Sequence, residues 1–183
     1  NGGTVNVHEL KNSKVGIVIT GNEVFNELID DKFAPILNKK ITELGSIVSE
    51  ITFAPDDVSL IKKAIEKHIK DGCDLILLSG GMSVDPDDVT RKGIYQAGAT
   101  EMNYGAAALP GAMFMVAYIN EIPLLGVPAC GLHHKVTVLD LILPRVLIGE
   151  HIGKKELAFI GHGGLCMDCP ECTHPHCPFG KGL

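Results

Sequence analysis

The chain has 183 residues, 45% of them hydrophobic, which is enough to bury one core and predicts one domain with extensions. Its formal net charge of −6 offers no broad basic surface, so nucleic acid and membrane surfaces are not expected partners. The longest apolar stretches, such as 112–119, fall far short of the ~20 residues of a membrane span, and no secretory signal opens the chain. We therefore expect a cytoplasmic protein. The sequence starts at Asn1 without Met, which leaves room for an upstream domain of the same polypeptide.

Alternating strand and helix patterns run through most of the chain. β-branched or aliphatic runs predict strands at 14–20, 47–53, 75–78, 99–104, 113–119 and 124–127. Apolar residues at helical spacing predict helices at 33–44, 58–70, 88–96 and 132–147. Asp31 is placed to cap the first of these helices, and Asp88 the third.

The order of these elements predicts an α/β fold. Strands that alternate with helices give a three-layer α/β/α sandwich with a mostly parallel central sheet. We assign residues 1–13 to an N-terminal lead-in, 14–148 to the sandwich and 149–183 to a Cys-rich extension. No internal repeat is visible.

Three loops follow predicted strands and are the candidate ligand-binding segments. They are 20–23, 55–57 and 79–90. In open α/β sheets, ligands bind at the carboxyl ends of the strands, where helix N-termini favour anions.

The longest of these loops has the residue types for a phosphate and a divalent cation. Gly80 and Gly81 let the backbone approach a ligand, Ser79 and Ser83 offer hydroxyl groups, and the Asp residues offer oxygen ligands for Mg²⁺. Each feature also has an ordinary structural interpretation, in which the glycines form a tight turn and the acidic residues cap helices or face solvent.

Together, these loops resemble the molybdopterin-binding domain family of molybdenum-cofactor biosynthesis proteins. The resemblance covers residues 14–148 and is carried by TGNE at 20–23, the Pro55-Asp56 pair and GGMSVDPDDVT at 80–90. The last motif is long and is similar to the family's Gly-Gly-Thr/Val-Gly/Ser signature followed by Asp-Val-Thr. Members of the family bind molybdopterin, a pterin dithiolene phosphate. Some adenylylate it with ATP, and others use Mg²⁺ to insert molybdate into the adenylylated form.

The resemblance implies roles for individual residues. It places Glu23, Asp56 and Asp88 at acidic positions near the metal and the cofactor, as the candidate catalytic residues. With the neighbouring loop residues, the predicted cofactor-binding set is Thr20, Gly21, Ser79, Gly80, Gly81, Ser83, Asp85, Pro128 and Cys130.

Two departures from the family pattern favour a binding module over an enzyme. Catalytic relatives tend to have Pro-Gly-Lys-Pro where this chain has LPGAM at 109–113, so a cation suited to phosphate or molybdate is absent. They have Leu-Pro-Gly-Asn/Ser-Pro where it has VPACG at 127–131. We therefore expect binding of molybdopterin or its adenylylated form for biosynthesis, delivery or sensing.

The alternative is a Mg²⁺-dependent molybdotransferase. Asp88 and Asp56 would position Mg²⁺, and Glu23 would orient molybdate or a water molecule. A generic nucleotide-binding domain is disfavoured, because the chain has no Walker lysine motif and no G-x-G-x-x-G after the first strand. Relatives form dimers or trimers, so the resemblance also implies a homo-oligomer.

The isolated cysteines and two neighbouring histidines have competing interpretations. Cys130 at a predicted helix N-terminus could have a lowered pKa and meet a molybdenum or sulfur species, although free Cys is more often inert and buried. Cys73 is expected in the core, and His133 and His134 are expected to face solvent.

Four cysteines close to the C-terminus predict a metal centre. Cys166, Cys169, Cys172 and Cys177 follow the spacing C-x2-C-x2-C-x4-C, and the last is followed by Pro178. This spacing is close to that of bacterial ferredoxins, so the four thiols could ligate one 4Fe-4S cluster. Zn²⁺ is the alternative, including a zinc ion held only for folding, because structural zinc sites commonly use four cysteines. His162, His174 and His176 also offer nitrogen ligands that zinc accepts.

Overall fold

The structure is a computed structural model that describes residues 5–82 and 88–181. Its strands are β1 (Lys14–Thr20), β2 (Ile47–Ala54), β3 (Leu75–Ser79), β4 (Thr100–Tyr104), β5 (Met115–Ile119) and β6 (Ile122–Val127). Its α-helices are α1 (Asn22–Phe25), α2 (Phe33–Glu43), α3 (Val58–Lys70), α4 (Thr90–Gln96), α5 (Val138–Leu147) and α6 (Lys154–Phe159). Short 3₁₀ helices cover Ala129–Leu132 and Ile160–Gly163.

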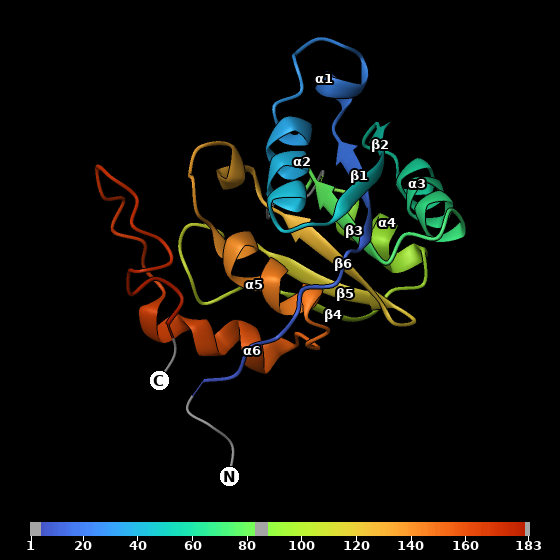
Figure 1. Ribbon diagram of the computed structural model, residues 1–183. Coiled ribbons are helices and arrows are strands. Elements are labelled where there is room, and N and C mark those ends of the chain that lie inside the picture. The colour runs from blue at the N-terminus through green and yellow to red at the C-terminus, as the bar shows by residue number, and fades with distance from the viewer. Residues whose placement is uncertain (1–4, 83–87, 182–183) are drawn as a thin grey trace.

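The strands form one mixed, mostly parallel sheet in the order β2-β1-β3-β6-β5-β4. The first four strands in this order, β2, β1, β3 and β6, pair in parallel. β5 runs antiparallel to both of its neighbours, β6 and β4. The carboxyl ends of β1, β2, β3 and β6 therefore lie along the same edge of the sheet (Figure 1).

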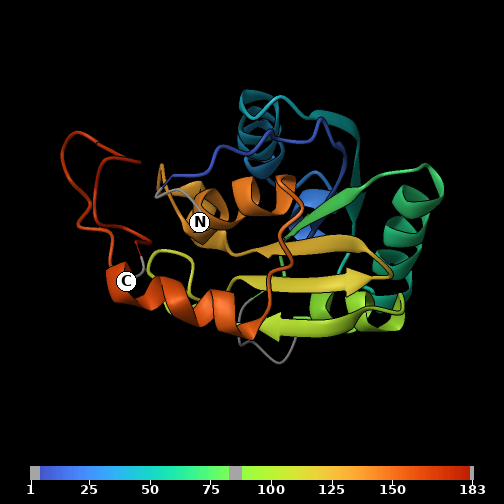
Figure 2. The same ribbon diagram turned by 60° about the horizontal axis from the view of Figure 1, so that its bottom comes forward.

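Helices cover both faces of this sheet, as Figures 1 and 2 show. On one face, alternate strand residues pack with α2, α5 and α6 in a core that includes Ile17, Leu77 and Leu143. On the other face, α3 and α4 pack on the opposite side of the strands, around Ile65, Ile76 and Ile94. The predicted α/β/α sandwich is confirmed.

The helix starts differ from the sequence predictions at two places. The predicted helix 88–96 begins at Thr90, and the residue before it, Val89, makes no side-chain cap, so the expectation that Asp88 caps it is wrong. The predicted helix 132–147 begins only at Val138, because Thr137 and Asp140 form a capping box that sets its first turn. The predicted cap of α2 is confirmed, since the Asp31 carboxylate accepts from the N–H groups of Phe33 and Ala34.

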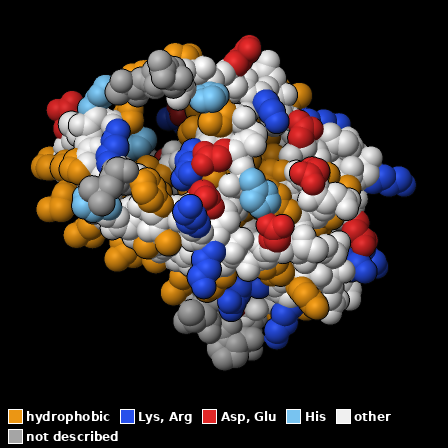
Figure 3. Space-filling view, turned by 90° about the horizontal axis from the view of Figure 1, so that it is seen from below, with side chains coloured by type: hydrophobic (Ala, Val, Ile, Leu, Met, Phe, Trp, Pro, Cys, Tyr) orange, Lys and Arg blue, Asp and Glu red, His pale blue; other side chains and the backbone are white. Residues whose placement is uncertain are grey.

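Figure 3 shows one face of the molecule, on which acidic and basic side chains are interspersed. Hydrophobic side chains gather at the left edge of the same view. Across the described residues, no helix is both long enough and apolar enough to cross a membrane.

The ends of β1 and β3 approach each other so closely that only glycine fits between them. A Cβ on Gly80 would lie 2.0 Å from the Thr20 carbonyl oxygen, and Gly80 has φ +96°. Gly98, at the end of α4, has nearly the same backbone angle, φ +95°, but nothing within 4 Å of an added Cβ.

This pair of glycines separates backbone strain from crowding. We expect Gly98→Ala to lower the free energy of unfolding by about 1 kcal/mol, the cost of left-handed backbone for an L-residue. Gly80→Ala carries the same backbone cost and also displaces Thr20, so it should lose about 1–3 kcal/mol more. Urea unfolding followed by circular dichroism measures both values; equal losses would show that the strand ends are not tightly packed.

His68 is a buried titratable group in the layer between α3 and the sheet. Its ring is fully buried, its Nε2 lies 3.1 Å from Thr52 Oγ1, and a Cβ on Gly16 would lie 2.6 Å from its Cγ. Desolvation lowers the pKa of His68 below its usual value, so the neutral ring is the native form.

The lowered pKa of His68 predicts a stability that depends on pH. Because the unfolded chain binds the proton more readily, the contribution is complete above about pH 6.5 and is lost as the pH falls below it. The free energy of unfolding should therefore fall by up to about 1.4 kcal/mol per pH unit between pH 6.5 and the native pKa. In His68→Gln this slope should be smaller, and parallel curves for the two proteins would contradict the prediction.

Candidate functional site

The turn after β3 forms the centre of the candidate site. Gly80 and Gly81 both have positive φ, and a Cβ on Gly81 would lie 2.4 Å from Thr90 Oγ1. The Thr20 hydroxyl lies 2.8 Å from the Thr90 hydroxyl and 3.3 Å from the Ser79 carbonyl oxygen. The turn is therefore held between the end of β1 and the start of α4.

Two residues of the predicted cofactor-binding set use their hydroxyls for hydrogen bonds within the protein. Thr20 is buried, and its hydroxyl makes the bonds just described. The Ser79 hydroxyl donates to the Val127 carbonyl oxygen at 3.3 Å. Ser79 is fully buried and ties β3 to β6. Ser83 and Asp85, which were also predicted to bind the cofactor, lie outside the described residues.

A cavity of about 560 Å³, the central cavity, opens beside this turn. Its lining combines Gly80, Gly81, Met82 and Asp88 with segments 109–113 and 128–130, His134, Leu165 and Cys166. It thus contains five of the predicted residues, namely Gly80, Gly81, Asp88, Pro128 and Cys130. Its described lining includes no lysine or arginine, in agreement with the LPGAM sequence at 109–113.

Asp88 contributes the one carboxylate of the central cavity's described lining. Its Oδ2 atom is buried and has no hydrogen-bond partner within the part of the chain that the structure describes. A buried carboxylate oxygen without a donor is costly, so a ligand, an ion or a water molecule with a hydrogen bond to donate would be stabilised beside it.

The other two acidic residues of the predicted site lie in a second cavity. This acidic cavity, of about 1030 Å³, is lined by Thr20, Gly21, Glu23 and Asp56, with further residues of 24–33 and His133. Asn22 joins its two sides, because the Asn22 N–H donates to Asp56 Oδ2 and the Asp56 N–H donates to Asn22 Oδ1, both at 3.0 Å.

The structure thus brings the predicted residues to one edge of the sheet but divides them between two cavities. Glu23 and Asp56 are exposed in the acidic cavity, and Asp88 is half-buried in the central cavity. Asp57, beside Asp56, is an ordinary helix cap that accepts from the Leu60 N–H at 2.9 Å.

Cys130 lines the central cavity, but the pKa suggested for it is wrong. Burial raises the pKa of the Cys130 thiol above its usual value, although bonds to backbone N–H groups partly oppose the shift. Cys130 is not at the N-terminus of the long helix expected there, since it lies in the 3₁₀ helix Ala129–Leu132 and α5 begins only at Val138. The thiol form of Cys130 is therefore favoured at neutral pH.

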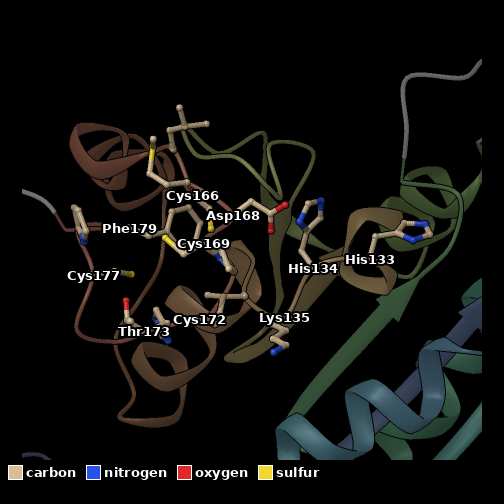
Figure 4. A pocket seen from close by; sticks show the side chains of 16 residues that line it. His133, His134, Lys135, Cys166, Asp168, Cys169, Cys172, Thr173, Cys177 and Phe179 are labelled. Carbon is tan, nitrogen blue, oxygen red and sulfur yellow. The ribbon is translucent and has the colours of Figure 1, made fainter.

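The four clustered cysteines line a third cavity, the tail cavity, of about 280 Å³ (Figure 4). Cys166, Cys169, Cys172 and Cys177 lie on one side, and His133, His134 and Lys135 come from the segment before α5. In residues 5–82 and 88–181, no three or more His, Cys, Asp and Glu side chains are grouped closely enough to hold a single metal ion.

Neighbouring histidines connect these cavities. His134 lines both the central and the tail cavity, and His133 lines both the tail and the acidic cavity. Leu165 and Cys166 are likewise shared between the central and the tail cavity. Nothing local in the sequence indicates that Leu165 lines the central cavity or that the two histidines line any of the three cavities.

Solved structures share this fold. The protein CinA from Thermoplasma acidophilum superposes with a TM-score of 0.62 at 17% identity, over 73% of this chain and 98% of its own. The molybdopterin biosynthesis enzyme MoaB from Thermus thermophilus superposes with a TM-score of 0.60 at 18% identity, over 75% and 98% of the two chains.

Sequence comparisons identify the family. A CinA-like protein of Petrotoga mobilis is 36% identical over 81 residues, which are 44% of this chain and 20% of that protein. The chain spans about a third or less of the length of the curated relatives it matches first. The family described as probable molybdopterin binding domain matches residues 16–148, which is most of the chain. This chain therefore belongs to the family of probable molybdopterin binding domains.

Proposed function

We propose that the chain binds molybdopterin or its adenylylated form in the central cavity, as part of molybdenum-cofactor biosynthesis, delivery or sensing. The observation that carries the proposal is the buried Oδ2 of Asp88 beside the Gly80-Gly81 turn, for which residues 5–82 and 88–181 supply no hydrogen-bond donor. The family assignment supports the class of ligand.

The residues present fit a pterin. Met82, Leu109 and Met113 supply apolar surface for a flat ring system, and the Asp88 carboxylate supplies an acceptor for ring N–H groups. Gly80 and Gly81 line the cavity without side chains, which supports close approach of the ligand's phosphate to the backbone.

The lining also favours binding over turnover. Phosphoryl and molybdate chemistry needs cationic groups to stabilise developing negative charge, and the described lining of the central cavity has no lysine or arginine. Asp88 is also in a different cavity from Glu23 and Asp56, with which it would have to act in a molybdotransferase.

The acidic cavity keeps the transferase as a second candidate. Glu23 and Asp56 are oxygen ligands of the kind that Mg²⁺ takes, and the acidic cavity lies at the same edge of the sheet as the central cavity. In this second candidate function, the pterin of an adenylylated ligand occupies the central cavity and its nucleotide extends towards the acidic cavity.

The proposal includes a separate metal centre at the four tail cysteines. Cys166, Cys169, Cys172 and Cys177 line one cavity, and thiolates are ligands for both zinc and iron–sulfur clusters.

Asp88→Asn tests the assignment of the central cavity. The change keeps the shape of the side chain and removes its charge, so the affinity for molybdopterin should fall about tenfold to a hundredfold, as expected for a hydrogen bond to a charged group. Quenching of pterin fluorescence under anaerobic conditions measures the affinity. Asp71→Asn is the matched control, because exposed Asp71 ends α3 at the opposite edge of the sheet.

A turnover assay distinguishes the two candidate functions. Adenylylated molybdopterin, molybdate and Mg²⁺ are incubated with the wild-type chain and with Asp88→Asn, and the molybdenum cofactor formed is measured. We expect binding without product. Product formed by the wild type and lost in the variant would establish the transferase instead, whereas unchanged affinity in Asp88→Asn would overturn the assignment of the cavity.

A further inference from the structure

The cysteine-rich tail is attached to the sandwich at both ends. At its start, Leu165 forms a parallel β-bridge with Leu109, in which the Cys166 N–H donates to the Leu109 carbonyl oxygen at 2.8 Å. At its end, the Gly180 N–H donates to the Gly163 carbonyl oxygen at 2.8 Å. Residues 165–180 therefore form a closed loop, visible in red in Figure 1.

Close packing positions this loop without help from a metal. Phe179 is 3% exposed and belongs to the core that contains α5. A Cβ on Gly180 would lie 2.4 Å from Leu141 Cδ1, and a Cβ on Gly163 would lie 2.1 Å from the Pro178 carbonyl oxygen. The two ends of the loop are thus fixed on the sandwich, and the cysteines between them are held over one cavity.

The cysteines differ in exposure in a way that suits a partly buried centre. Cys166 and Cys177 are half-buried and pack against the core, whereas Cys169 and Cys172 are exposed. Figure 4 shows all four on the tail, with His134 and Lys135 on the other side of the cavity. A cluster bound by four thiolates is negatively charged, and Lys135 brings a positive charge to the same cavity.

The spacing of the cysteines favours a cluster over a single ion. Cys166, Cys169, Cys172 and Cys177 line one cavity of about 280 Å³. Their spacing, C-x2-C-x2-C-x4-C followed by Pro178, is close to that of bacterial ferredoxins, in which cysteine thiolates bind 4Fe-4S clusters.

We propose that Cys166, Cys169, Cys172 and Cys177 bind a 4Fe-4S cluster, and that the cluster forms part of the wall of the central cavity. Cys166 and Leu165 line both cavities, so a cluster bonded to Cys166 fixes the segment that the ligand of the central cavity meets. The first half of the proposal is independent of the pterin, and the second half rests on the proposed function.

Metal analysis of the anaerobically purified chain tests the cluster. We expect about four iron and four acid-labile sulfide per chain, with visible absorption that dithionite bleaches. The double variant Cys169→Ser, Cys172→Ser should lose both, while Cys73→Ala, which removes a thiol from the core, should retain them. One zinc per chain without iron, no bound metal, or wild-type iron in the double variant would each overturn the cluster.

The shared wall is tested by the response of each site to the other. Molybdopterin should change the electron paramagnetic resonance spectrum of the reduced wild-type cluster, and it should bind the double variant at least tenfold more weakly than the wild type. An iron-loaded wild type whose spectrum and affinity are both insensitive would refute the shared wall. Wild-type protein with a full cluster and no affinity for molybdopterin would refute the proposed function and the shared wall but leave the cluster in place.

Discussion

The contact between the ends of β1 and β3 is the constraint on which the candidate site depends. Gly80 lies so close to the Thr20 carbonyl oxygen that a side chain has no room, and the Thr20 and Thr90 hydroxyls hold the next turn. This packed junction brings the Gly80-Gly81 turn to the central cavity, while Thr20 lines the acidic cavity. The contact between Thr20 and Gly80 therefore contributes to the walls of both the central and the acidic cavity.

The layers of the fold follow from local patterns that the sequence displays openly. Aliphatic runs such as 75–78 predict buried parallel strands, and β3 is indeed buried along its whole length. The helix predicted from residue 132 was too long, because hydrophobic spacing continues through 132–147 whereas the cap at Thr137 and Asp140 determines where α5 begins. Periodicity shows which face of a helix is buried, but capping sets its ends.

The site was predictable only in part, for a physical reason. Residues that follow strands, such as Gly81, Asp88 and Pro128, could be placed at one sheet edge because parallel strands end together. The division of the predicted site residues between two cavities depends on side-chain packing. This packing places Glu23 and Asp56 in the acidic cavity and Asp88 in the central cavity. The contribution of Leu165 and Cys166 depends on a bridge to Leu109 that is remote in sequence and has no local signature.

The pair His133 and His134 has a consequence for communication within the molecule. These adjacent residues lie between a 3₁₀ helix and the cap of α5, and between them they touch the central, acidic and tail cavities. His133 and His134 form part of the walls of all three cavities. A molecule that displaced this segment would therefore change the walls of more than one cavity at the same time.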